Sequence, residues 1–296
     1  MNDQRVGRLL ILVAAIMWST SGFFAKSPAF ADWPTQLQGM PVRGPLLAFW
    51  RALFACLVLI PFVRRPRWTP KLIPMLFAYV VMNYTFMNAL TLTTEGNAIW
   101  LQHTAPVWVF LVGVGVLGET VHRRDWWLLA CCVSGVGLIV LFESQGQSPA
   151  GIVYGLLSGV SYGAIVLSLR HLRAEDGAWL IMLNNAVTAF VFLPIVIHYG
   201  IWPAAGQTAY LAGFGVLQMG LPYLLFAHGL RRIAGHEASG IVLLEPILVP
   251  VWVFVAWGHL PSYESPRWWT LAGGGLILIG LLFRYAGGRK AGAEED

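Results

Sequence analysis

A single carboxylate, Glu245, stands in the middle of a long apolar stretch, residues 238–257. Placing a charged side chain there costs about 2.5–3.5 kcal/mol in a membrane, so the group is expected to face a cavity or a polar partner. Pro246 follows it and leaves the carbonyl oxygen of Val242 without its helical donor. Glu245 is therefore the first candidate for binding a ligand or a proton. A carboxyl group that only locks its helix to a neighbour is the alternative.

A second polar face is predicted in the apolar stretch 97–117. Trp100 and His103 lie three residues apart, at helical spacing, so they are expected to point in similar directions. Histidine changes its charge near neutral pH and can handle protons. We therefore expect Trp100 and His103 to line a substrate pocket, with a hydrogen-bonded packing role as the alternative for His103.

Other apolar stretches contribute aromatic and amide side chains that are predicted to line the same pocket. Aromatic rings offer apolar or cation–π contacts, and amides can orient polar groups. Each of these residues could instead serve only in packing between helices. The set is Trp18, Asn83, Tyr84, Asn88, Tyr162 and Tyr223.

Two further features have mainly structural interpretations. Arg51 lies about two turns from one end of its apolar stretch, so we expect it to extend toward lipid headgroups rather than to bind substrate. Glycines at every fourth position of the stretch 150–169 predict close helix packing rather than the wall of a pocket. They are Gly151, Gly155, Gly159 and Gly163.

The composition excludes a water-soluble globular protein. Hydrophobic residues make up 57% of the chain and charged residues only 11%, against about one quarter charged in soluble domains. Three cysteines, an odd number set in apolar runs, imply no disulfide framework. Basic residues sit at loop positions, which favours a membrane protein over a nucleic-acid partner.

Ten apolar runs predict an all-α integral membrane protein. Helices are expected because lipid offers no hydrogen-bond partners to an unpaired backbone. The longest loop, 27–44, is expected either to cover part of an entrance or only to tether two helices. The predicted spans are about 7–25, 46–63, 72–92, 97–117, 126–142, 150–169, 178–198, 208–229, 238–257 and 268–285.

The chain shows signs of an internal duplication, because the landmarks of the stretch 98–119 recur 140 positions later. The matched pairs are Ala98 and Ala238, Pro106 and Pro246, and Gly118 and Gly258. Five spans per copy make the copies run in opposite directions through the membrane. We therefore predict two inverted five-helix repeats, 1–146 and 147–286, and a disordered cytoplasmic tail, 287–296.

Lysine and arginine are distributed unevenly between the predicted loops. If the first helix begins in the cytoplasm, fifteen of the 19 basic residues fall on the cytoplasmic side. Only Lys26, Arg43 and Arg267 fall outside, and Arg51 lies within a span. Since cytoplasmic loops carry the excess of basic residues, we predict a multi-pass protein of the bacterial inner membrane with both termini in the cytoplasm.

Several short motifs stand in a definite order along the chain: Trp18, Arg51, Pro106, Gly118-Glu119 and Leu244-Glu245-Pro246. Their order resembles the EamA branch of the drug/metabolite transporter superfamily over essentially the whole chain. One departure is Gly258-His259, where relatives usually carry Gly-Glu. The resemblance implies a metabolite exporter whose central cavity is lined chiefly by spans one, three, four, six, eight and nine.

We therefore expect a monomeric secondary transporter that exports a small amphipathic metabolite, such as an amino acid, by alternating access. A facilitator or channel without alternating access is the first alternative. A membrane-embedded enzyme or lipid-handling protein is the second, but the sequence offers no catalytic dyad, metal-ligand spacing, phosphate loop or dinucleotide fingerprint. No cofactor is expected.

Overall fold

The computed structural model describes residues 3–116, 118, 123–143, 149–172, 174–233 and 235–286. The predicted tail 287–296 and Glu119 lie outside this part of the chain. The helices are α1 (Asp3–Trp18), α2 (Ser21–Ala25), α3 (Arg43–Leu59), α4 (Leu72–Leu92), α5 (Glu95–Gln102), α6 (Ala105–Gly115), α7 (Arg123–Glu143), α8 (Pro149–His171), α9 (Gly177–Tyr199), α10 (Ala205–Gly213), α11 (Leu221–Leu230), α12 (Gly235–Val242), α13 (Leu244–Trp257) and α14 (Trp268–Ala286).

Shorter elements join or interrupt these helices. Two 3₁₀ turns, η1 (Pro28–Phe30) and η2 (Ile60–Phe62), lie at helix ends, and a π-helical segment, η3 (Phe214–Gly220), separates α10 from α11. Strands β1 (Gln36–Leu37) and β2 (Met40–Pro41) form a small antiparallel hairpin in which Leu37 faces Met40. Its turn uses Gln38 and Gly39, both with positive φ.

Within the described residues, nine helical stretches are long and apolar enough to cross a membrane. A tenth, Trp268–Phe283, is apolar but shorter. Each lies where the sequence predicts a span, and α4 coincides with the predicted limits 72–92. The prediction of a helical, multi-pass membrane protein is thus confirmed.

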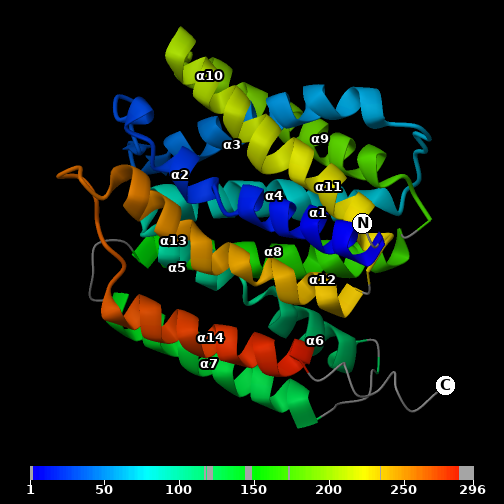
Figure 1. Ribbon diagram of the computed structural model, residues 1–296. Coiled ribbons are helices and arrows are strands. Elements are labelled where there is room, and N and C mark those ends of the chain that lie inside the picture. The colour runs from blue at the N-terminus through cyan, green and yellow to red at the C-terminus, as the bar shows by residue number, and fades with distance from the viewer. Residues whose placement is uncertain are drawn as a thin grey trace.

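The helices run roughly parallel to one axis (Figure 1). In that view α5 and α6 run from left to right, whereas α12 and α13 run from right to left. Helices α7 and α14 lie side by side along one edge of the bundle. The N-terminus and the last turn of α14 lie toward the same end.

Glycines allow the closest helix contacts, as the four-residue stripe predicted. A Cβ atom at Gly159 of α8 would lie 2.6 Å from the carbonyl oxygen of Leu101, and one at Gly155 would lie 2.8 Å from the Leu101 side chain. Helices α7 and α14 use the same device, since a Cβ at Gly273 would lie 2.6 Å from the Gly135 carbonyl oxygen. These small residues let backbones meet directly.

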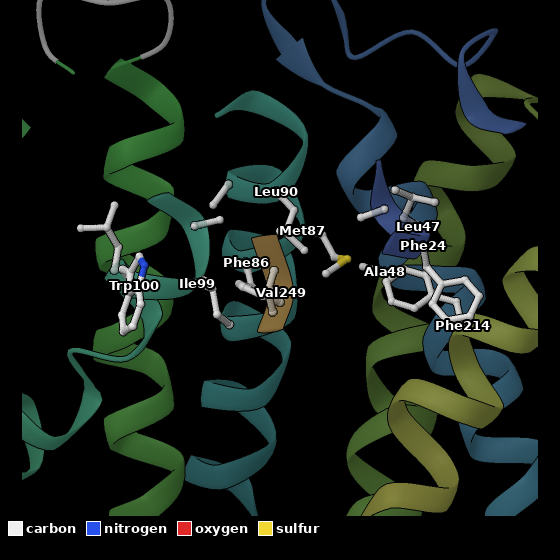
Figure 2. Packing of buried hydrophobic residues seen from close by; sticks show 14 of the residues in the cluster. Phe24, Leu47, Ala48, Phe86, Met87, Leu90, Ile99, Trp100, Phe214 and Val249 are labelled. Carbon is white, nitrogen blue, oxygen red and sulfur yellow. The ribbon is translucent and has the colours of Figure 1, made fainter. Parts of the chain in front are cut away.

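Apolar side chains from both halves of the chain share one core (Figure 2). The rings of Phe24 and Phe214 stack there at a centroid distance of 5.2 Å. Ile99 points toward Val249 of α13, whereas Trp100 points to the other side of α5.

The segment 27–44 is folded onto the bundle. Phe30 and Trp33 are buried, and the Gln207 side chain of α10 donates to the carbonyl oxygen of Ala29 at 2.8 Å. Arg43 Nε donates to the Trp33 carbonyl oxygen at 2.9 Å. Buried aromatic residues and these hydrogen bonds therefore hold the segment against the bundle. It is more than a tether between two helices.

Candidate functional site

Two membrane helices are interrupted at matching positions. Helix α5 ends at Gln102 and α6 begins at Ala105, one residue before Pro106. Helix α12 ends at Val242 and α13 begins at Leu244, two residues before Pro246. Proline has no N–H group and its ring clashes with the carbonyl four residues earlier, so both breaks follow from the sequence. Such breaks are tolerated in membranes where they are buried in protein or line a polar space.

His103 and Glu245 meet between these two breaks. His103 Nε2 lies 4.0 Å from Glu245 Oε2, and both side chains are largely buried, at 10% and 15% exposure. His103 Nδ1 lies 3.0 Å from the carbonyl oxygen of Ile99. Because a carbonyl oxygen only accepts, Nδ1 must carry the proton, and Nε2 is the nitrogen that faces Glu245.

This geometry leaves both groups able to bind something else. A distance of 4.0 Å exceeds that of a direct hydrogen bond. A polar group that enters between Nε2 and Oε2 can therefore bond to both. A carboxylate is an acceptor with several lone pairs, so a ligand ammonium or hydroxyl group is the natural complement.

A cluster of aromatic side chains lies near Glu245. The rings of Trp18 and Tyr223 meet edge to face at 4.9 Å, and the Phe226 ring lies 5.1 Å from the Trp18 ring. The Tyr223 hydroxyl is close enough to Glu245 and to Tyr162 for electrostatic interaction. Five of the nine predicted site residues are thus brought together here. They are Trp18, His103, Tyr162, Tyr223 and Glu245.

Arg51 does not extend toward lipid, so that expectation was wrong. Its side chain is 1% exposed in the structure. One guanidinium nitrogen donates to Gln218 Oε1 of η3 at 3.2 Å, another donates to Asn83 Oδ1 of α4, and the guanidinium lies 5.0 Å above the Phe214 ring. Gln218 Nε2 in turn donates to the carbonyl oxygen of Trp18 at 3.3 Å. Arg51 thus bonds to buried side chains of the protein and not to lipid headgroups.

This arginine clamp, formed by Arg51, Asn83 and Gln218, joins α3, α4 and η3 beside the aromatic cluster. Asn83 is a predicted site residue, but Gln218 was missed. Its signal in the sequence was an amide within the apolar run 208–229. Tyr79 was missed as well. Its hydroxyl donates to Asn185 Oδ1 at 3.4 Å and lies near Tyr223.

The remaining three predicted residues contact other parts of the bundle. Tyr84 packs edge to face on Tyr154 of α8, at 5.8 Å. Asn88 lies directly against Gly44 of α3. The Trp100 indole covers Gly274 of α14. Trp100 and His103 keep helical spacing, since the His103 N–H donates to the carbonyl oxygen of Ile99 at 3.0 Å, but they face different helices: Trp100 meets α14 and His103 meets Glu245 of α13.

Among the described residues, no group of three or more His, Cys, Asp or Glu side chains is arranged to hold a metal ion. The cluster around His103 and Glu245 offers a carboxylate, an imidazole, phenol hydroxyls and aromatic faces, which are groups that can recognise a ligand.

Comparisons with known proteins show that the chain is similar to transporters. The family model described as the EamA-like transporter family matches the chain twice, over residues 5–141 and 149–285. An uncharacterized transporter of Archaeoglobus fulgidus is 25% identical over 95% of this chain and 97% of its own length. The pseudopaline exporter CntI of Pseudomonas aeruginosa is 30% identical over 70% of this chain and 73% of its own length.

Two further similarities are to proteins of lower sequence identity. The S-adenosylmethionine uptake transporter of Rickettsia prowazekii is 24% identical over 57% of this chain and 60% of its own length. A solved crystal structure matches 98% of this chain and 99% of its own, with a TM-score of 0.64 and 16% sequence identity, which shows a shared fold. The chain belongs to the EamA-like transporter family, and it is a transporter rather than an enzyme.

Proposed function

We propose that this protein is a secondary transporter of the bacterial inner membrane that exports a small amphipathic metabolite, an amino acid or a related compound, by alternating access. Its ten helices form two inverted five-helix repeats, 1–146 and 147–286, and both termini lie in the cytoplasm.

The single observation that carries the proposal is the meeting of His103 and Glu245 between two helix breaks, 4.0 Å apart and largely buried. A carboxylate at membrane depth needs a partner, and a substrate ammonium group would supply one. Trp18 and Tyr223 would hold the apolar part of the same substrate, by packing and by cation–π contact.

Two further observations support the architecture. Helices α5 and α6 run opposite to α12 and α13 (Figure 1), as inversion requires. The family match falls into two segments of similar length, 5–141 and 149–285. Inverted repeats place one substrate site at the repeat interface and provide two similar barriers around it.

The relatives include a protein named as an exporter and others named as uptake transporters. We propose export because the exporter shares 30% identity, against 24% for the uptake transporter.

The test is counterflow in proteoliposomes. Purified protein is first screened for thermal stabilisation by amino acids, amines and nucleosides, and any hit is loaded inside vesicles as unlabelled compound. Alternating access predicts saturable uptake and transient accumulation of external labelled compound above equilibrium. Flux that rises linearly with concentration and shows no counterflow would instead indicate a channel and would refute the mechanism.

A further inference from the structure

A separate cavity of about 530 Å³ opens at the end of the bundle opposite the N-terminus. The start of α5, the segment after α2 and the loop between α13 and α14 form its walls. Its charged and aromatic lining residues include Lys26, Arg43, Glu95, Trp257, Tyr263 and Glu264. None of these belongs to the cluster around His103 and Glu245.

Both cations in this cavity already have partners in the protein. Lys26 Nζ donates to the carbonyl oxygen of Thr93 at 2.8 Å. Arg43 Nε donates to the carbonyl oxygen of Trp33 at 2.9 Å. Burial lowers the pKa of Lys26, and the Glu95 and Glu264 carboxylates oppose this effect. The positive groups are therefore held against backbone, and they offer little to an incoming anion.

The Glu95 carboxylate interacts electrostatically with Lys26 but keeps one oxygen without a hydrogen bond. The side chain lines the cavity although the residue is only 2% exposed, and the unpaired oxygen is Oε1. A buried carboxylate oxygen without a donor is costly. The lone pairs of this oxygen could accept a hydrogen bond from a ligand that brings a donor and a positive charge.

The other walls suit the organic part of such a ligand. Trp257 and Tyr263 supply aromatic faces, which attract cations as well as apolar groups. Burial raises the pKa of Tyr263, and the Glu95 carboxylate adds to this effect, so the phenol lies near that carboxylate. Two more carboxylates line the cavity, Glu143 and the exposed Glu264, and they add negative charge.

We propose that this cavity is a second binding site, which takes the primary ammonium group of a small organic amine or amino acid, with Glu95 as its anchor. The site stands on its own geometry and does not require the central cluster to be the transport site.

Titration calorimetry with phenethylamine on the purified full-length protein tests this site. Losing a hydrogen bond to a charged group predicts that Glu95→Gln weakens binding roughly 10- to 100-fold. The matched control is Glu264→Gln, on the same cavity but exposed, which should weaken binding less than about threefold. Phenylacetate, an acid with a similar ring, should not bind there.

A second measurement locates the ligand without altering Glu95. Ser262 is exposed and lines the cavity, so Ser262→Cys should be alkylated rapidly, and phenethylamine should slow this alkylation at least fivefold, as read by peptide mass. If phenethylamine does not bind, binds equally to Glu95→Gln, or leaves alkylation at position 262 unchanged, the proposal is wrong. Binding that is lost in Glu245→Gln and kept in Glu95→Gln would leave the central site standing and refute only this one.

Discussion

The two broken helices, α5–α6 and α12–α13, share a shape but differ in chemistry. Each is interrupted just before a proline, and the two prolines are 140 positions apart. At the break, the first copy has His103 where the second has Leu243. The second has Glu245 where the first has Ala105.

The position of the break and the polar side chains at the break are therefore specified by different residues. Proline sets the break in both copies, whereas each copy supplies only one member of the polar pair. His103 and Glu245 therefore come together only when the two halves of the chain pack against each other. A movement between the halves would change the distance between these two groups.

The beginnings of the two helices differ as well. Glu95 starts α5 and lines the cavity, and its buried Oε1 atom has no hydrogen-bond partner. Glu237, in the first turn of α12, accepts a hydrogen bond from Arg8 of α1. At one end of the bundle the carboxylate thus keeps an unpaired oxygen, and at the end that carries the N-terminus the carboxylate is in an ion pair.

The largest effect is expected from Glu245→Gln, which keeps the shape of the side chain and removes its charge. The loss of a charged hydrogen bond costs about 1.5–3 kcal/mol. The substrate concentration for half-maximal uptake into proteoliposomes should therefore rise roughly 10- to 100-fold. The melting temperature should stay close to that of the wild type.

The control is Glu175→Gln, a carboxylate in the turn between α8 and α9. It should leave uptake kinetics unchanged. Wild-type kinetics in Glu245→Gln would remove the main argument for the central site.

Gly159→Ala should have the next largest effect, on stability. The added methyl group would meet the Leu101 carbonyl oxygen and Thr104 beside the break of α5–α6. Overpacking of this kind costs about 1–3 kcal/mol, seen as a lower melting temperature in detergent. Gly275→Ala is the matched control, because a methyl group there meets nothing within 4 Å. If both variants melt alike, the close contact does not stabilise the bundle.

His103→Leu makes the first copy like the second at this position. Loss of one neutral hydrogen-bonding group costs about 0.5–1.5 kcal/mol, so half-maximal uptake should need roughly 2- to 10-fold more substrate. His171→Leu, an exposed histidine at the end of α8, should have no effect. A larger loss in His103→Leu than in Glu245→Gln would reverse the roles assigned to the pair.

Arg8→Ala should have the smallest effect. The Arg8 side chain is 52% exposed, and exposed ion pairs contribute about 0–1 kcal/mol. The melting temperature should fall only slightly, and added salt should reduce the difference further. Arg5→Ala, an exposed residue on the same helix, serves as the control. A large drop for Arg8→Ala alone would show that this pair closes its end of the bundle more firmly than exposed charges normally do.

The sequence predicted the fold well because membrane helices are determined locally. Apolar runs and backbone satisfaction placed α4 at its observed limits. The spans 97–117 and 238–257 were predicted as continuous helices, and their interruptions before Pro106 and Pro246 were not predicted. Glu245 stood out because charge is rare at that depth. Four of the other eight predicted site residues lie in the same cluster, with Trp18 linked to it through Tyr223.

The errors share one physical cause, which is that contacts between helices are not encoded in the period of any one helix. Trp100 and His103 do share one helical turn, but α14 lies against the first and Glu245 of α13 lies against the second. Arg51 was expected to reach lipid because its depth was known but its neighbours were not. Tyr79 and Gln218 were missed because their roles depend on Asn185 and Arg51, which lie on other helices.

The π-helical segment η3 contains one residue more than an α-helix would need over the same axial distance. Deleting Leu217 would therefore let the segment close as an ordinary helix, with α10 and α11 keeping their directions. Gln218 would rotate off Arg51 and release the carbonyl of Trp18, to which it now donates. A relative whose chain is shorter by one amino acid here would keep the architecture yet lose the arginine clamp, so a length difference at this point would report on the site.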